Sequence, residues 1–388
     1  MGFTVNKPGM CTTIQDRGRK GYLGSGFSPS GVVDMRAFIQ ANILVENDPN
    51  APVVEFCLAG PTLRFTTDTF IALTGGDFNA KLDGRPIRTY GAIKVLRGQV
   101  LSFGAPKNGV FGYLAIAGGG VDVPSVMGSK STNLKCGIGG FKGRPLNTGD
   151  FLRFKTRTVE YLPNLSSHNL ENDDAFYEFD KEEIVIRVIP GPQADLFTEH
   201  GLCTFFSSTY MTTSKSDRMG YRLEGPSIET LDGSDIVSDG IAFGAVQVPN
   251  HGQPIIMLSD RQTTGGYAKI GTVASVDIPR LAQRTPGRKL RFVPVTVQEA
   301  QRLYRENLAR EATLRKRVNR PSREDVSPRT TARRLTPILE AQAEKSAKQR
   351  LWIQNDNPFR RETHKEEKYQ NEDAARRVKS VGKHQAER

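Results

Sequence analysis

The 388-residue sequence has no apolar run that approaches the roughly 18–20 residues of a membrane-spanning helix. Its first residues, MGFTVNKPGM, lack the apolar core of a secretory signal. The four cysteines lie far apart and form no Cys-x-x-Cys pair, unlike the cysteines of zinc sites and disulfide frameworks. The histidines His168, His200 and His251 are isolated from one another and from any cysteine pair, so we predict no metal site. These absences favour a chain of the reducing cytoplasm.

The positive charge is concentrated at one end of the chain. Residues 297–388 carry 23 Lys and Arg against 14 Asp and Glu, which is +9 of the formal net charge of +12. The same segment contains one of the 38 glycines. We therefore expect a Gly-rich, nearly neutral body over residues 1–296 and a charged tail over 297–388. A solvated tail is the simplest interpretation, and contact with nucleic acid is an alternative that we do not favour.

The start of this tail has a helical pattern over residues 297–317. Four apolar residues lie near one face of that helix and are expected to pack on the body: Val297, Ala300, Leu303 and Leu308. Beyond Pro321 the apolar positions are few, so no packed structure is predicted there.

The body has the pattern of a mainly β protein. Short runs of alternating apolar residues are broken about every 8–12 residues by Gly, Asp or Pro. One helix is predicted over residues 34–44, with Asp34 as its N-cap. A polar, acidic stretch at 156–183 separates this region from a second β-rich region at 184–296.

The two β-rich regions share short motifs. Three of them recur in the same order, at 58–61 and 223–226, at 91–95 and 244–248, and at 149–154 and 287–292. This favours a duplicated β-barrel. We therefore divide the chain into a first subdomain (1–155), a linker or insertion (156–183), a second subdomain (184–296) and the tail. Two packed barrels create a cleft, and ligand sites favour such interfaces.

The densest group of polar residues is the run SDRQTTGGYAKI, which follows an apolar strand. Gly265 and Gly266 let a ligand approach the backbone closely and offer N–H donors to an oxyanion. Arg261 suits the binding of a carboxylate or phosphate, and Lys269 adds a point charge. Asp260 is a candidate to move a proton, or it pairs with Arg261. The alternative is a polar turn between strands with no chemical role.

Two further clusters have similar chemistry. One contains Asp217 and Arg218, and the other contains Gln15 and Asp16, followed by Ser30 after the next turn. Both also fit ordinary charged turns in which an aspartate caps the backbone.

A short Gly-Ser-Lys run and a single acid each allow two interpretations. The run GSKST at 128–132 has Gly, Lys and Ser, but it lacks the Gly-x-x-x-x-Gly-Lys spacing of a phosphate loop. We therefore do not expect this chain to bind a nucleotide alone. Glu55 stands among apolar neighbours, as either a proton donor with a raised pKa or a paired structural acid.

Taken together, these motifs resemble the biotin-dependent carboxyltransferase-like family over about residues 3–296. In the first half the resemblance rests on PG at 8–9, TTIQDRGR at 12–19, SG at 30–31 with Asp34, LTGG at 73–76, GS at 128–129 with ST at 131–132, GGF at 139–141 with GRPL at 143–146, and GD at 149–150. In the second half it rests on PGPQ at 190–193, SDRMG at 216–220, LEGP at 223–226, SDG at 238–240 and DRQTTGGY at 260–267. The family includes the C subunit of 5-oxoprolinase, allophanate hydrolase subunit 2 and the carboxyltransferase domain of urea amidolyase.

The resemblance implies a mainly β fold of two tandem cyclophilin-like β-barrel subdomains with a few short helices. It also implies a component of an ATP-dependent 5-oxoprolinase, which opens 5-oxo-L-proline to L-glutamate at a cleft shared with partner chains that resemble the A and B subunits of that enzyme. ATP would then be bound together with those partners.

Two alternatives remain open. One is biotin-dependent carboxyl transfer to urea or a similar amide, although the chain has no Met-Lys-Met biotin-attachment motif. The other is a non-enzymatic protein that antagonises a kinase inhibitor by binding it.

The motifs and the resemblance together give the candidate residues. The candidate catalytic residues are Asp260, Arg261, Lys269, Asp217 and Arg218. The candidate substrate-binding residues are Gln262, Thr263, Thr264, Gly265, Gly266, Tyr267, Gln247, Gln15, Asp16 and Ser30.

Overall fold

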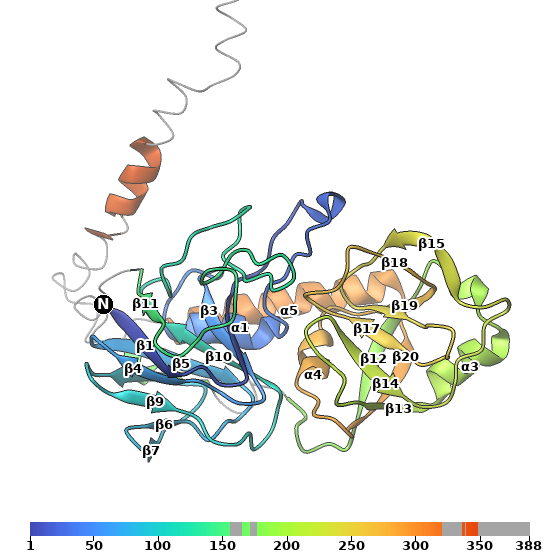
Figure 1. The fold of residues 1–388 in the computed structure, drawn as a ribbon, viewed down its shortest axis with the longest axis horizontal. Helices are drawn as coiled ribbons and strands as arrows, with labels where there is room; N and C mark the ends of the chain where they lie inside the picture. Colours follow the sequence, from blue (N-terminus) through green and yellow to red (C-terminus); the bar gives the residue numbers. More distant parts are fainter. Residues whose placement is uncertain (156–164, 171–176, 320–335, 338, 348–388) are drawn as a thin grey trace, which may run out of the picture. The chain divides into compact units, whose positions relative to one another are not determined.

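The computed structural model describes residues 1–155, 165–170, 177–319, 336–337 and 339–347. The chain divides into two compact units, Met1–Arg320 and Pro321–Arg388. In the second unit the described residues are helical and exposed, and the remainder of the predicted tail beyond residue 319 lies outside the described residues. In the first unit, Figure 1 shows two β-rich halves and few helices, which confirms the predicted fold class.

The first half contains two antiparallel sheets. The six-stranded sheet has the order β11-β1-β4-β9-β6-β7, and the five-stranded sheet has the order β2-β3-β10-β5-β8. The strands are β1 (Gly2–Lys7), β2 (Cys11–Gln15), β3 (Val53–Cys57), β4 (Thr62–Phe65), β5 (Thr69–Gly75), β6 (Lys81–Leu82), β7 (Arg85–Pro86), β8 (Ala92–Val95), β9 (Val100–Ser102), β10 (Phe111–Ile116) and β11 (Phe151–Arg153). Apolar side chains from both sheets form one core, so the sheets pack face to face.

The five-stranded sheet is covered on its other face by helix α1 (Met35–Leu44). In β5, Ile71 and Leu73 point into the core between the sheets, whereas Phe70 and Ala72 join the cluster that contains α1. This alternation follows from the two-residue period of a strand. Asp34 caps α1, because its carboxylate accepts the N–H of Ala37 at 2.9 Å. The predicted helix and its cap are therefore confirmed.

The second half is a closed barrel with the order β12-β19-β16-β17-β14-β13-β20. Its strands are β12 (Glu183–Pro190), β13 (Thr209–Thr212), β14 (Gly220–Glu224), β16 (Ala245–Gln247), β17 (Ile255–Met257), β19 (Lys269–Val273) and β20 (Lys289–Pro294). The parallel pair β12–β20 joins its first and last strands. A separate two-stranded ribbon consists of β15 (Asp235–Gly240) and β18 (Thr264–Tyr267).

Short helices complete the second half. They are α3 (Glu199–Ser207) and α4 (Ile278–Ala282). Three 3-10 turns also occur along the first unit, namely η1 (Leu23–Ser25), η2 (Leu165–Ser167) and η3 (Ala194–Leu196). A continuous apolar cluster runs from α1 and the outer faces of β5 and β10 to the barrel and α4. The two halves therefore share a core.

Gln283, which follows α4, joins the two halves with hydrogen bonds. Its Oε1 accepts the N–H groups of Val110 and Phe111 at 2.9 and 3.1 Å. Its Nε2 donates to the Asp34 carboxylate at 2.8 Å. Burial raises the pKa of Asp34, and the hydrogen bonds from Ala37, Gln283 and Tyr177 oppose that shift.

Helix α5 (Val297–Val318) confirms the predicted helix at the start of the tail, and it belongs to the first compact unit. In Figure 1 it extends from the barrel to the first half, where it contacts α1. The predicted apolar face is wrong: Val297 and Leu308 are 48% and 43% exposed, while Leu314 and Val318 pack on the core. The other two predicted residues, Ala300 and Leu303, are partly exposed, and the C-terminal turns of the helix make the contact with the core.

The predicted linker falls partly on residues 156–164 and 171–176, which lie outside the described residues. Its described part is not only a surface segment. Leu165 and Leu170 are buried in the shared core, and the main chain of Leu170 bonds Tyr90. Each of these buried leucines stabilises the contact with the body by about 1.5–3 kcal/mol.

The barrel also contains an ion pair between the buried Asp277 and the half-buried Arg187, with a testable pH dependence. The Asp277 carboxylate accepts the backbone N–H and the Nε–H of Arg187 at 2.9 and 2.8 Å. Burial favours the protonated acid, but the bonds from Arg187 hold the pKa of Asp277 below its ordinary value. The pair therefore stabilises the fold above the unfolded pKa of about 3.9, and this contribution is lost as the pH falls through the lower, folded pKa.

Asp277→Asn is expected to lower the free energy of unfolding by about 2–3 kcal/mol at neutral pH, because it removes a charged acceptor. The difference from the wild type should shrink as the pH falls below about 4. Urea unfolding at several pH values measures both effects, with Asp232→Asn, an exposed aspartate, as control. A deficit that is the same at every pH would contradict this account.

Candidate functional site

The two halves meet at the guanidinium of Arg218, which comes just before β14. Its Nε donates to the Asp260 carboxylate at 2.8 Å, and its Nη2 donates to the carbonyl of Gly31 at 2.7 Å. Its Nη1 donates to the Glu55 carboxylate on β3. Arg218 and Glu55 are buried. One side chain of the second half is thus bonded to a carboxylate and a carbonyl of the first half.

Opposite charges offset part of the cost of burying this cluster. Burial raises the pKa of Glu55, and the Arg218 guanidinium counteracts part of that shift. Burial also works against the charge of Arg218, but the carboxylates of Asp260 and Glu55 raise its pKa above the ordinary value. The sequence allowed two interpretations of Glu55, a proton donor or a paired structural acid. Its bond to Arg218 supports the paired structural acid.

Two serines add to the same junction. The Ser259 hydroxyl donates to the carbonyl of Val32 at 3.1 Å, and the Ser28 hydroxyl donates to the carbonyl of Ser259 at 3.0 Å. The start of the polar run SDRQTTGGYAKI is therefore fixed against the first half. The rest of the run lies elsewhere.

A second polar cluster lies within the second half, around Lys269 on β19. The Lys269 ammonium is 3.3 Å from the Asp239 carboxylate and 3.5 Å from Oε1 of Gln193. Lys269 is only 4% exposed, whereas the Asp239 side chain is 57% exposed. The cluster therefore connects a buried cation to a solvent-accessible carboxylate.

Gln247 on β16 pairs in register with Lys269, so the two side chains come from neighbouring positions of the barrel. Its Nε2 is buried and has no hydrogen-bond partner among the described residues. A Cβ added at Gly265 would lie 2.8 Å from that nitrogen. The glycine thus packs closely against an amide N–H donor that has no acceptor, where a larger residue would clash.

This second cluster has the groups that a reacting amide requires. The Lys269 ammonium and the Gln247 amide are donors for a carbonyl oxygen that gains negative charge. The Asp239 carboxylate can accept a proton and return it, and Gly240 N–H and Lys269 lower its pKa. We take this group, Lys269, Gln247, Asp239 and Gln193, as the candidate active site.

The structure places the predicted residues of the polar run in two separate groups. Asp260 joins Arg218 at the junction, while Gly265 and Gly266 lie on the ribbon of β15 and β18. A Cβ at either glycine would meet atoms of the second half alone. The two glycines therefore do not lie at the cleft between the halves, where the sequence analysis expects a ligand site. Four other candidates of the run are exposed or partly exposed on the loop and ribbon: Gln262, Thr263, Thr264 and Tyr267.

Arg261 does not pair with Asp260. Its Nε donates to the carbonyl of Ile241 at 2.9 Å, and its Nη1 donates to the carbonyl of Leu258 at 3.3 Å. The guanidinium lies over the ring of Phe243, with 5.7 Å to the centroid. Burial lowers the pKa of Arg261 to about 10. In this structure its guanidinium holds the loop through two carbonyls.

Asp217 stabilises a turn. Its Oδ1 accepts the N–H groups of Met219 and Gly220 at 2.7 and 3.2 Å, and the residue is exposed. This matches the alternative of an aspartate that caps the backbone.

The Gln15 and Asp16 cluster holds loops of the first half together. The Asp16 carboxylate accepts bonds from the hydroxyls of Ser129 and Ser131, both at 2.6 Å, and from the N–H of Lys130 at 2.7 Å. The run that partly resembles a phosphate loop therefore surrounds a carboxylate of its own chain. These three donors are therefore satisfied within the chain.

Gln15 and Ser30 are buried near the same loops. Gln15 donates through Nε2 to the carbonyl of Thr132 at 3.2 Å and accepts the N–H of Gly31 at 3.2 Å. Ser30 has φ of +54°, and its hydroxyl is buried without a partner among the described residues. Both residues position the loop that carries the Gly31 carbonyl to Arg218.

Two members of the candidate active site lie in recognised motifs but were not predicted as site residues. Gln193 ends the PGPQ motif, and Asp239 stands in SDG. The signal that could have found them is the glycine close to each one. A Cβ at Gly191 would lie 2.2 Å from the carbonyl oxygen of Lys269, so that turn packs directly on the strand of the lysine.

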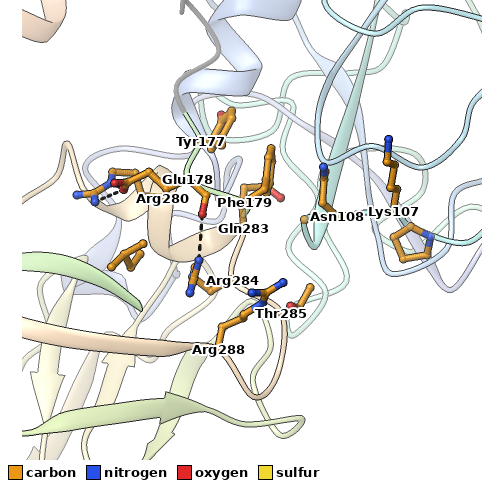
Figure 2. Close-up of a pocket in the computed structure, with 13 residues that line it drawn as sticks. Lys107, Asn108, Tyr177, Glu178, Phe179, Arg280, Gln283, Arg284, Thr285 and Arg288 are labelled. Carbon is orange, nitrogen blue, oxygen red and sulfur yellow. Dashed lines mark hydrogen bonds and ion pairs between the residues drawn. The ribbon is translucent and has the colours of Figure 1, made fainter. Parts of the chain in front are cut away.

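A pocket of about 100 Å³ lies between the halves, shown in Figure 2. Its walls come from the loop at 106–109, the segment 177–179 and residues 280–288. None of its residues was predicted as a site residue. Within the part of the chain that the structure describes, no group of three or more His, Cys, Asp or Glu suits a metal ion, and no helix is long and apolar enough to cross a membrane.

The comparisons with known proteins agree with the fold. The family described as "Carboxyltransferase domain, subdomain A and B" matches residues 25–294. The chain is 40% identical over 311 residues to the C subunit of 5-oxoprolinase from Escherichia coli (strain K12), covering 79% of this chain and 97% of that protein. It is 37% identical over 295 residues to the C subunit of 5-oxoprolinase from Haemophilus influenzae, covering 76% of this chain and 92% of that protein.

The fold is also similar to the crystal structure of the K. lactis urea amidolyase. The TM-score is 0.73 and the identity 31%, over 81% of this chain and 20% of that chain. This chain therefore spans about a fifth of that enzyme.

Proposed function

The chain belongs to the carboxyltransferase-domain family, subdomains A and B, and we propose that it is the C subunit of an ATP-dependent 5-oxoprolinase that opens 5-oxo-L-proline to L-glutamate. One observation carries the proposal: the similarity to the C subunit of E. coli 5-oxoprolinase extends over nearly the whole length of that protein. The enzyme would be a hydrolase acting on a cyclic amide, with the candidate active site on this chain.

The chemistry of a lactam fits the group around Lys269. A lactam carbonyl oxygen gains negative charge when the amide is attacked, and Lys269 with the unpartnered Gln247 amide would stabilise that charge. Asp239 would take the proton from the attacking water and pass it to the ring nitrogen when the C–N bond breaks. Gln193 bonds both Lys269 and Asp239, so it would hold the two in register.

ATP would supply the free energy and the activation that a stable lactam needs. The donors of the GSKST loop at 128–132 already bond the Asp16 carboxylate, so partner subunits would contribute to the ATP site. The expected partners are chains that resemble the A and B subunits of 5-oxoprolinase. We place the complex in the cytoplasm, which agrees with four free cysteine thiols.

The test is reconstitution with the chains encoded beside this one in the genome. The mixture, supplied with ATP and 5-oxo-L-proline, is expected to form glutamate, and this chain alone is expected to form none. Glutamate measured by an enzyme-coupled assay, with ADP release in parallel, gives the result. No glutamate from the complete mixture, together with urea-dependent ATP turnover on addition of a biotin carrier, would instead establish the carboxyltransferase alternative.

The same mixture also tests the non-enzymatic alternative. A protein that only antagonises a kinase inhibitor would bind its partner equally well whether or not Lys269 is intact. Assembly measured by size-exclusion chromatography therefore accompanies each activity measurement.

A further inference from the structure

Two of the four cysteines, Cys11 and Cys57, lie opposite each other in the five-stranded sheet. Cys11 is the first residue of β2 and Cys57 is the last residue of β3, and the antiparallel pairing of these strands places the two directly across from one another. Both thiols are free and partly exposed. The two cysteines form no Cys-x-x-Cys motif, so it is the fold that brings their thiols together.

The spacing of the two strands suits a bond between the two sulfurs. Residues directly opposite in an antiparallel pair have Cα atoms about 4.5–5.5 Å apart, which lies within the roughly 4.4–6.8 Å that a disulfide spans. Their Cβ atoms are about 4.5–5.5 Å apart, whereas a disulfide requires about 3.5–4.5 Å, so the two side chains must approach slightly. The pair lies at the ends of both strands, and β2 is at the edge of its sheet, so this approach requires little movement of the sheet.

The surroundings make Cys11 the more acidic of the two thiols. A hydrogen bond from the Cys57 thiol and the charge of the Arg218 guanidinium lower the pKa of Cys11 to about 7. Burial and the nearby carboxylates of Glu55 and Asp260 oppose this shift. The same hydrogen bond and burial raise the pKa of Cys57 above its ordinary value. Near neutral pH, a large fraction of Cys11 is therefore the nucleophilic thiolate, while Cys57 keeps its proton.

The pair also lies beside the residues that connect the two halves. Side chains alternate along a strand, so Cys57 shares its face of β3 with Glu55, whose carboxylate bonds Arg218. Cys57 packs against the apolar cluster that the two halves share. A bond between the two sulfurs would therefore form next to the junction of the halves.

We propose that Cys11 and Cys57 are an oxidative modification site, at which a hydroperoxide converts the two thiols into a disulfide and Cys11 is the attacking group. The inference does not depend on the proposed function. The Cys11 thiolate attacks one oxygen of hydrogen peroxide, the O–O bond breaks, and the hydroxide that leaves takes up a proton and becomes water. Cys11 is then a sulfenic acid.

The second step closes the disulfide. The Cys57 sulfur attacks the sulfenic sulfur of Cys11, the S–O bond breaks, and the hydroxide that leaves combines with the Cys57 proton to give a second water. In total the two thiols lose two electrons and two protons, and hydrogen peroxide accepts them. Two molecules of a small thiol reverse the change by thiol–disulfide exchange and become a disulfide themselves.

Oxidation of the full chain with a slight excess of hydrogen peroxide at neutral pH tests the proposal. The intact mass is expected to fall by two hydrogen atoms, and digestion should give a peptide in which Cys11 is linked to Cys57. Dithiothreitol should restore the original mass. Cys136→Ser combined with Cys203→Ser removes the two exposed cysteines, and this matched control should lose the same two hydrogen atoms at the same rate.

Two single variants test the order of the steps. Cys57→Ser is expected to stop at a sulfenic acid on Cys11, which dimedone traps and peptide mapping locates. Cys11→Ser leaves the protonated Cys57 thiol, which should react with peroxide about tenfold more slowly. The proposal is overturned if the wild type loses no hydrogen atoms under peroxide, if the linked peptide joins another pair of cysteines or two chains, or if the two single variants react equally fast.

Discussion

Arg218→Ala is expected to lower the free energy of unfolding by about 3–5 kcal/mol. The substitution leaves Glu55 buried on β3 without the guanidinium that compensates it, and it removes the bond to the Gly31 carbonyl. Because these bonds connect the two halves, the loss should appear as a lower urea midpoint for the whole first unit. Arg222→Ala, an exposed arginine on β14, is the control and should change stability by less than about 0.5 kcal/mol.

The loss should depend on pH in a defined direction. Burial already raises the pKa of Glu55, and removal of Arg218 removes the opposing influence, so the folded pKa should rise further. The protonated acid is compatible with burial. The deficit should therefore be smallest below the unfolded pKa of about 4.3 and should grow as the pH rises through the folded pKa. Arg218→Met combined with Glu55→Leu, which removes both charges, should recover part of the stability. A deficit equal to that of Arg222→Ala would contradict the assignment of Arg218 as the connecting residue.

Lys269→Met is expected to reduce glutamate formation by the reconstituted complex about 10²–10³-fold. The methionine keeps the length of the side chain but removes the donor that faces the developing charge. Stability should change little, because Asp239 is largely exposed and stays hydrated without its partner. Lys289→Met removes a lysine of β20 that pairs with Glu182 on the surface, and it should keep full activity.

Two measurements accompany this comparison. Assembly with the partner subunits should be the same for wild type, Lys269→Met and Lys289→Met, which excludes a loss of the complex as the cause. Full activity in a correctly assembled Lys269→Met complex would show that the catalytic groups lie elsewhere.

Several features of this protein were accessible from the sequence because they depend on local pattern. The alternating strands, the N-cap at Asp34 and the helix that begins at Val297 each follow from residues within a few positions of one another. The apolar face of that helix was mispredicted, since packing on α1 selects Leu314 and Val318 rather than the residues near its start. A helical period gives the faces of a helix but does not say which one meets a neighbour.

The family was also determined by sequence, because its motifs are turn sequences in which glycine and aspartate have fixed positions. The candidate site was only partly accessible. Lys269 and Gly265 were chosen from one polar run and Gln247 separately. Their grouping with Gln193 and Asp239 comes from the pairing of β16 with β19 and of β15 with β18.

Tertiary structure alone decided which charges pair. Asp260 has an arginine beside it in the sequence, yet it bonds Arg218, 42 residues away, and Arg218 in turn bonds Glu55, 163 residues away. The Asp16 carboxylate accepts hydrogen bonds from donors more than a hundred positions further along the chain. A side chain chooses its partner by the position and burial that the folded core gives it, and no local pattern encodes that distance. For this protein, the sequence specifies the strands, the turns and the family, whereas the packing of the two halves decides which polar residues support the fold and which remain available for a ligand.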